Sequence, residues 1–109
     1  MSSAEIAAGP APVFAALGDV TRLSLLRTLS DGERRSIATL TEGTGLTRQA
    51  VTKHLGVLEQ AGLVGSRRRG RQRSFVYRPD RVAEARTYLD QVSAHWDDAL
   101  GRLRALVED

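Results

Sequence analysis

The sequence predicts a mainly α-helical fold with one small β-hairpin, built as a single domain. Apolar residues recur at three- and four-residue spacing in several stretches, which is typical of the buried face of a helix. Between residues 63 and 77 this pattern gives way to two short strand-like runs on either side of an arginine-rich turn. The chain of 109 residues has room for one modest core. We expect a flexible N-terminal arm over residues 1–12 and one folded domain over residues 13–109.

Two helices are expected at the start of that domain. A short apolar segment over residues 13–17 ends at Gly18, and Asp19 can then cap a longer helix. Arg22, in the first turn of this second helix, is expected to be a surface or salt-bridge residue. Three leucines define the face of the second helix that we expect to be buried, with Leu25 beside them: Leu23, Leu26 and Leu29.

Two further helices, joined by a glycine-bearing turn over residues 42–46, form a helix-turn-helix unit. Ser36 can cap the first of these helices, and Thr47 can cap the second, which ends at Gly62. One face of the second helix is apolar and is predicted to lie in the core: Val51, Leu55 and Leu58.

The opposite face of that second helix carries side chains that hydrogen-bond base edges and phosphates. They stand near the helix N-terminus, where anions are favoured. His54, between the two faces, could donate to a phosphate or pack as a satisfied ring, and we favour the phosphate. The pattern indicates a DNA recognition helix, although a solvated polar face is the commoner meaning of such a pattern taken alone. The residues expected on DNA are the cap and the polar face: Thr47, Arg48, Gln49, Thr52, Lys53 and His54.

The turn of the expected hairpin is strongly basic. Helix, glycine, strand, basic turn and strand follow one another in the order of the second half of a winged helix-turn-helix. In that fold the helix enters the major groove, and the hairpin, or wing, lies along the DNA backbone. Five arginines at the turn are therefore expected to contact DNA: Arg67, Arg68, Arg69, Arg71 and Arg73.

Charge is unevenly distributed along the chain, although the net charge is only +3. Residues 47–81 carry nine basic residues against two acidic ones. Residues 1–46 carry four arginines against five acids, and residues 82–109 carry three arginines against six acids. A basic centre between mildly acidic ends indicates a polyanion site on an otherwise ordinary surface.

Asp80 can cap a last helix that runs to about Val107. At 1.5 Å per residue this helix is roughly 40 Å long. A domain this small cannot cover such a length, so we expect part of the helix to meet a second copy of the chain. The alternative is a helix folded back on its own core. The apolar seam alternates steps of three and four: Val82, Ala85, Leu89, Val92, Trp96, Ala99, Leu103 and Leu106.

Three stretches together resemble the ArsR-type winged helix-turn-helix repressors of bacteria. They are ALGDVTRLSLLRTLSDG over residues 16–32, TGLTRQAVTKHLGVLEQAGLV over residues 44–64 and SRRRGRQRSFVYR over residues 66–78. The resemblance implies a homodimer that binds an operator and represses transcription, and it places the same helix residues and wing arginines on DNA. Gly56 stands where the family usually has a basic residue. Dimer contacts are implied from the first and last helices, here Phe14, Leu89, Val92, Trp96 and Leu103.

Many members of that family sense metals through a cysteine pair on the third helix, or through aspartate and histidine on the last. This chain has no cysteine, which removes thiolate ligands, thiol nucleophiles and disulfides and fits a reducing cytoplasm. Because the last helix offers one histidine beside Asp90, Asp97 and Asp98, too few ligands for a closed site, we expect no metal and no cofactor. The resemblance is closer to the metal-independent branch. That histidine is His95.

Other classes of function find less support in the sequence. The chain has no glycine-rich phosphate loop followed by lysine and no thiol, so an enzyme is not expected. The N-terminus lacks the basic and apolar regions of a signal peptide or membrane anchor. A winged-helix module for protein contacts or for RNA binding remains the alternative, and nothing in the sequence points to an effector.

Overall fold

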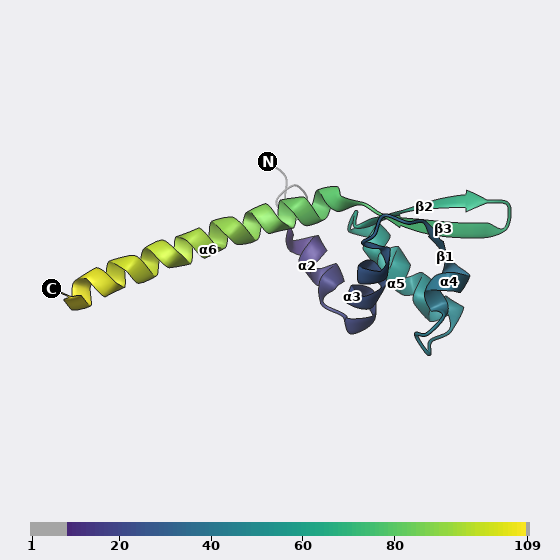
Figure 1. The fold of residues 1–109 in the computed structure, drawn as a ribbon, viewed down its shortest axis with the longest axis horizontal. Helices are drawn as coiled ribbons and strands as arrows, with labels where there is room; N and C mark the ends of the chain where they lie inside the picture. The colour runs from purple at the N-terminus through teal and green to yellow at the C-terminus, as the bar shows by residue number, and fades with distance from the viewer. Residues whose placement is uncertain (1–8, 109) are drawn as a thin grey trace.

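The computed structural model describes residues 9–108 and consists of a helical body, a small sheet and one long projecting helix (Figure 1). The predicted mainly α fold with a hairpin wing is confirmed. The start of the expected arm, residues 1–8, lies outside the described residues. The elements in order are α2 (Ala11–Leu17), α3 (Val20–Leu29), β1 (Arg35–Ser36), α4 (Ile37–Thr41), α5 (Arg48–Gln60), β2 (Val64–Arg69), β3 (Gln72–Tyr77) and α6 (Pro79–Glu108).

Three helices begin at the polar residues that the sequence predicts as caps. Asp19 Oδ2 accepts from the Arg22 backbone N–H at 3.0 Å, at the start of α3. Ser36 Oγ at α4 and Thr47 Oγ1 at α5 each accept from the backbone N–H three residues on, at 3.1 Å. A cap of this kind is worth about 1 kcal/mol, because it satisfies an N–H that the helix leaves without a partner.

Helix α5 ends in a backbone motif that turns the chain into β2. The Leu63 N–H donates to the Leu58 carbonyl at 3.0 Å, and the Gly62 N–H donates to the Glu59 carbonyl at 2.9 Å. This pair of bonds requires a left-handed residue after the helix, and Gly62 has φ 78°. A residue with a Cβ would be strained here, so Gly62 fixes where the wing begins.

The sheet has three antiparallel strands in the order β1-β3-β2. The two wing strands are longer than the apolar runs that predicted them, because pairing continues up to Arg69↔Gln72. Gly70 and Arg71 form a two-residue loop in which Gly70 has φ 62°, as the first central position of a type II′ turn requires. Four of the five wing arginines therefore lie in strands, and only Arg71 lies in the turn. Strand β1 was not predicted, because two residues carry no periodic pattern.

The core lies between α2, α3, α4, α5 and the inner side of the sheet. Val51, Leu55 and Leu58 of α5 are fully buried, as predicted. On α3 the prediction was wrong in part, since Leu25 is buried and Leu23 is 49% exposed. The α3 side chains that pack inward follow the spacing of Leu25 and Leu29, four residues apart on one helix face, and Leu23 lies off that face.

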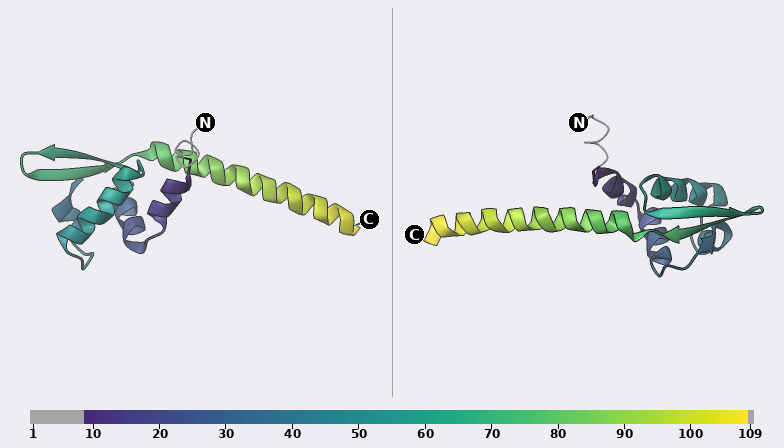
Figure 2. Two further views of the ribbon diagram at one scale, coloured as in Figure 1. Left: turned by 180° about the vertical axis from the view of Figure 1, so that it is seen from behind. Right: turned by 90° about the horizontal axis from the view of Figure 1, so that it is seen from above.

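Helix α6 begins at Pro79, so Asp80 lies within its first turn instead of preceding it as a cap. Pro79 is tolerated there because the first helical N–H groups have no acceptor within the helix. The first turns pack on the body, where Ala85 is buried and the Phe14 and Tyr88 ring centroids lie 6.1 Å apart. Beyond them the helix runs free of the body in both views of Figure 2, and the molecule is 68 Å long. None of the described helices is long and apolar enough to cross a membrane.

Candidate nucleic-acid interface

The polar face of α5 is presented to solvent because the opposite face is locked into the core. Thr47, Arg48, Gln49 and Lys53 are exposed, and they line one shallow hollow with Ala50 and Thr52. The Thr52 hydroxyl donates to the Arg48 carbonyl at 2.6 Å, which leaves its oxygen as an acceptor. The face therefore offers cationic, amide and hydroxyl groups that can reach base edges and phosphates.

His54 lies at the edge of this face, half-buried against the start of α3. Arg22 Nη1 donates to His54 Nδ1 at 3.3 Å, and Asp19 Oδ2 lies 3.7 Å from the same nitrogen. A ring with its proton on Nε2 would accept from Arg22 at Nδ1, and a ring with protons on both nitrogens would instead pair with Asp19 there. The Arg22 backbone N–H holds the pKa of Asp19 below its usual value. In both arrangements Nε2 carries a proton that His54 can donate to a phosphate.

Arg22 is a residue whose role the sequence did not indicate. Its Nε donates to the Ala16 carbonyl at 2.6 Å, and its Nη2 donates to the Ala15 carbonyl at 3.4 Å. One side chain therefore joins the end of α2, the start of α3 and the recognition helix. No local pattern could have predicted this, because its partner on α5 lies 32 residues away in sequence.

The wing has two different faces, since residues directly opposite on an antiparallel ladder point to the same side. Arg68 pairs with Arg73, and this face turns toward α5. We call the hollow on that side the inner hollow. It combines the wing with the recognition helix and the start of α4, and it is lined by Ser36, Ile37, Ala38, Arg48, Thr52, Arg68, Arg71, Gln72 and Arg73.

Within the inner hollow the arginines differ in their partners. Arg73 Nη2 donates to Glu59 Oε1 at 2.8 Å, and its guanidinium carbon lies 4.9 Å from the Phe75 ring centroid. Ser66 Oγ on the other wing strand donates to Glu59 Oε2. No ion pair engages Arg48, Arg68 or Arg71 within residues 9–108, so these three remain able to neutralise phosphates.

The opposite face of the wing carries Arg67, paired with Ser74, and Arg69, paired with Gln72. The hollow on this side, the outer hollow, also includes Arg34 from the segment before β1. Arg34 was not among the predicted site residues, because it lies outside the basic stretch 47–81 and β1 is too short to recognise. Its guanidinium donates to Ser74 Oγ at 3.3 Å.

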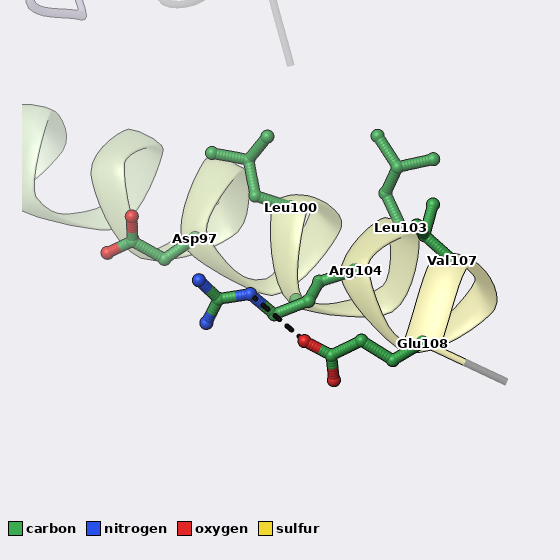
Figure 3. A pocket seen from close by; sticks show the side chains of 7 residues that line it. Asp97, Leu100, Leu103, Arg104, Val107 and Glu108 are labelled. Atoms are coloured by element: carbon green, nitrogen blue, oxygen red, sulfur yellow. Dashed lines mark ion pairs between the residues drawn. The ribbon is translucent and has the colours of Figure 1, made fainter.

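The residues expected at a dimer interface lie along α6 and at its contact with α2. Phe14 and Val92 are half-buried, whereas Leu89, Trp96 and Leu103 are 52%, 63% and 58% exposed. Near the C-terminal end, Leu100, Leu103 and Val107 point to one side of the helix, and Arg104 and Glu108 form a 3.7 Å ion pair on the adjacent face (Figure 3). Leu100 and Val107 directly follow Ala99 and Leu106 of the predicted apolar seam. They therefore make the exposed apolar stripe wider than predicted.

The acids and histidine of α6 do not converge. Over residues 9–108, no group of three His, Asp or Glu side chains is close enough to hold a metal ion.

Comparison with known proteins places this chain in a family. A model of the helix-turn-helix domain matches residues 17–67. The Bacillus subtilis (strain 168) protein YuzN, an uncharacterized HTH-type transcriptional regulator, is 42% identical over 71 residues, which cover 60% of this chain and 77% of YuzN. A probable mercury resistance operon repressor of Streptomyces lividans is 39% identical over 71 residues, covering 65% of this chain and 56% of that repressor. The solved ArsR-like transcriptional regulator from Rhodococcus sp. RHA1 has a TM-score of 0.76 at 33% identity and covers 89% of this chain and 91% of that one.

The fold, the exposed recognition helix and these relatives define a winged helix-turn-helix transcriptional regulator that binds DNA. Within that class, the chain belongs to the ArsR family.

Proposed function

We propose that the protein is a homodimeric repressor that works in the cytoplasm and recognises an inverted-repeat operator. The observation that carries this proposal is the inner hollow, where Arg48 and Thr52 of α5 share one concave surface with Arg68 and Arg71 of the wing. A duplex seated there meets base-reading groups and phosphate-binding groups at the same time. The repressor named among the relatives supports the direction of regulation.

Dimerisation is supported by the uncovered half of α6. Its exposed apolar side chains include Leu89, Trp96, Leu100 and Leu103, and a helix with such a stripe buries it against another helix when it can. A second copy supplies the same stripe by symmetry. Two copies would present two recognition helices to successive major grooves, which one copy cannot do.

The residues that we propose to read and hold the duplex follow from exposure and charge. Thr47, Arg48, Gln49, Thr52 and Lys53 would meet base edges and adjoining phosphates, and His54 would donate from Nε2 to a phosphate. Arg67, Arg68, Arg69 and Arg71 would contact the backbone. Arg73 differs from them, because Glu59 engages its guanidinium within the protein.

The experiment is selection of bound sequences from random duplex DNA, followed by titration of variants on the selected site. A palindromic consensus is expected. Arg48→Ala or Gln49→Ala should cost about 1–3 kcal/mol and relax the preference at particular base pairs. Arg68→Ala should weaken all duplexes alike, because phosphate contacts carry no sequence information.

The control for nucleic-acid class is duplex RNA of the selected sequence, which should bind weakly, since its deep major groove does not admit the helix. Equal binding of RNA and DNA, or selection without any consensus, would contradict the proposal.

We also propose that DNA binding does not depend on a metal. Thiolates are absent from this chain, and soft metals such as mercury and cadmium prefer sulfur ligands, so the mercury in the relative's name does not carry over. Operator titrations with zinc, cadmium or arsenite should overlay those with a chelator. A metal bound in stoichiometric amount with micromolar or tighter affinity would contradict this.

A further inference from the structure

The outer hollow is a second basic surface, separated from the recognition helix by the wing itself. Arg67 and Arg69 line it together with their ladder partners, Ser74 and Gln72. Paired residues of an antiparallel ladder point to the same side of the sheet, so all four side chains lie on the outer face of the wing. The wing is therefore basic on both sides, and the arginines of β2 alternate between the two hollows.

Arg34 adds a guanidinium to the outer hollow, and a hydrogen bond holds it in place; Arg35 lines the hollow as well. Arg34 Nη1 donates to Ser74 Oγ at 3.3 Å, which holds the guanidinium against β3 from a point 40 residues earlier in the chain. The neighbouring Arg35 is engaged differently, since its guanidinium donates to both carboxylate oxygens of Asp31 at 2.7 and 2.8 Å. Within the described part of the chain, Arg34, Arg67 and Arg69 take part in no ion pair.

The rest of the lining suits an oxyanion. Thr39 Oγ1 accepts from Ser36 Oγ at 3.1 Å, so the Thr39 hydroxyl proton remains able to donate, and Gln72 supplies an amide. Hydroxyl, amide and guanidinium donors are the groups that bind phosphate oxygens along a DNA backbone. The inner and outer hollows also adjoin, because Ser36 and Gln72 line both of them.

We propose that the outer hollow binds the DNA backbone that flanks the half-site read by α5, with Arg34 as a contact residue. This inference rests on the proposed function. When α5 lies in the major groove, the wing lies over the neighbouring minor groove, which is about 6 Å wide and has one phosphate strand on each side. The inner arginines face the strand that borders the recognition helix. The outer set of Arg34, Arg67 and Arg69 faces the phosphate strand on the far side of the minor groove. The protein therefore contacts the backbone of more base pairs than those whose edges it reads.

The test compares two duplexes, one carrying the selected operator with long flanks and one cut at the outer edge of each half-site. On the long duplex, Arg34→Ala should weaken binding about threefold per protomer and should lower the salt slope by about one per protomer, because each phosphate contact contributes about 0.9 to that slope. On the short duplex it should have no effect. The selected base preference should stay unchanged on both.

Matched variants separate contact from structure. Arg67→Ala should reproduce the dependence on duplex length, and Arg34→Lys should retain most of the affinity. Arg68→Ala, on the inner side, should weaken binding to both duplexes equally. Arg27→Ala, an exposed arginine of α3 outside both hollows, should change neither.

Equal losses on the long and short duplexes for Arg34→Ala, or no loss on either, would overturn the inference, and an acidic protein partner would then be the better occupant of this face. A parent protein that fails to select any duplex would instead overturn the proposed function, so the two failures are distinguishable.

Discussion

Arg73 of the wing donates to Glu59 of the recognition helix, with 2.8 Å between Nη2 and Oε1. The same carboxylate accepts from Ser66 on the other wing strand through its second oxygen. A single acidic residue thus ties both strands of the wing to the last turn of α5. We expect these bonds to hold the wing at a fixed angle to α5, in a region that is otherwise strongly basic.

Loss of this carboxylate should reduce specificity while raising general affinity for DNA. In Glu59→Gln the ion pair is gone, so Arg73 is free to neutralise a phosphate and the wing is less firmly held. Affinity for random duplex should rise about threefold, with a salt slope larger by about one per protomer. The ratio of operator to random-duplex affinity should fall. Titration of both duplexes at several salt concentrations measures this.

The matched control is Glu84→Gln, which removes an exposed ion pair with Arg81 on α6. Thermal unfolding should show little change for either variant, because partly exposed pairs contribute about 0–1 kcal/mol. An unchanged specificity ratio in Glu59→Gln would mean that the wing angle is fixed by the backbone alone.

The elements of this fold could be predicted from the sequence where local rules determine them. Asp19, Ser36 and Thr47 bond the N–H three residues on, and Val51, Leu55 and Leu58 recur on one helix face. Both relations are visible in a short stretch of sequence. The order of helices and hairpin then leaves few alternatives to a winged helix.

The finer organisation of the candidate interface depends on contacts between distant residues. The Arg34 bond to Ser74 spans 40 residues, and the Arg22 bond to His54 spans 32. The arginines lie on both faces of the wing because of the ladder register, which the Gly70 loop sets. From the sequence alone all five arginines were expected at the turn. Leu23 shows the same limitation, since leucines crowd α3 and only packing decides which of them is buried.

Acid should remove the contribution of one ion pair that holds the segment after α3. The Arg35 guanidinium, and then the Glu33 backbone N–H, hold the pKa of Asp31 well below its usual value. A carboxyl whose folded-state pKa is depressed stabilises the fold above its unfolded-state pKa, and that stabilisation is lost as pH falls toward the folded-state value. Asp31→Asn should therefore destabilise the protein at neutral pH, with a difference from the parent that shrinks below about pH 4.

Urea unfolding at pH 7, 5 and 3 measures this difference. Asp97→Asn, an exposed aspartate of α6, is the control and should match the parent throughout. A difference between Asp31→Asn and its parent that stays constant down to pH 3 would show that the substitution acts through something other than the charge.

Replacing Gly56 by alanine should reduce neither the stability of the protein nor its affinity for the operator. Gly56 lies inside α5, at a position where the family usually has a basic residue. Among the described residues nothing lies within 4 Å of a Cβ built there. Gly56→Ala should raise the free energy of unfolding by about 0.5–1 kcal/mol, because glycine is a poor helix former. Operator affinity should be unchanged, and a drop in affinity despite higher stability would mean that the DNA backbone approaches this position closely.

The exposed seam of α6 should determine whether the protein dimerises and so binds both half-sites of the operator at once. Trp96 is 63% exposed in the single chain and lies in the middle of the uncovered stripe between Leu89 and Leu103. If this stripe packs on a second copy, Trp96→Asp buries an unpaired charge in the interface, which costs several kcal/mol per dimer. The variant should sediment as a monomer and keep its helical content, since α6 contacts its own body only through its first turns.

Such a monomer should keep weak affinity for any duplex and lose tight binding to the inverted repeat, whose half-sites should lie about 10 base pairs apart or a small multiple of that spacing. Ala94→Asp is the matched control, because its spacing from Trp96 puts it on the opposite side of the helix, and it should remain a dimer with normal operator binding. A Trp96→Asp protein that stays dimeric and binds the operator normally would move the dimer interface to another surface, and the apolar end of α6 would then need a different partner.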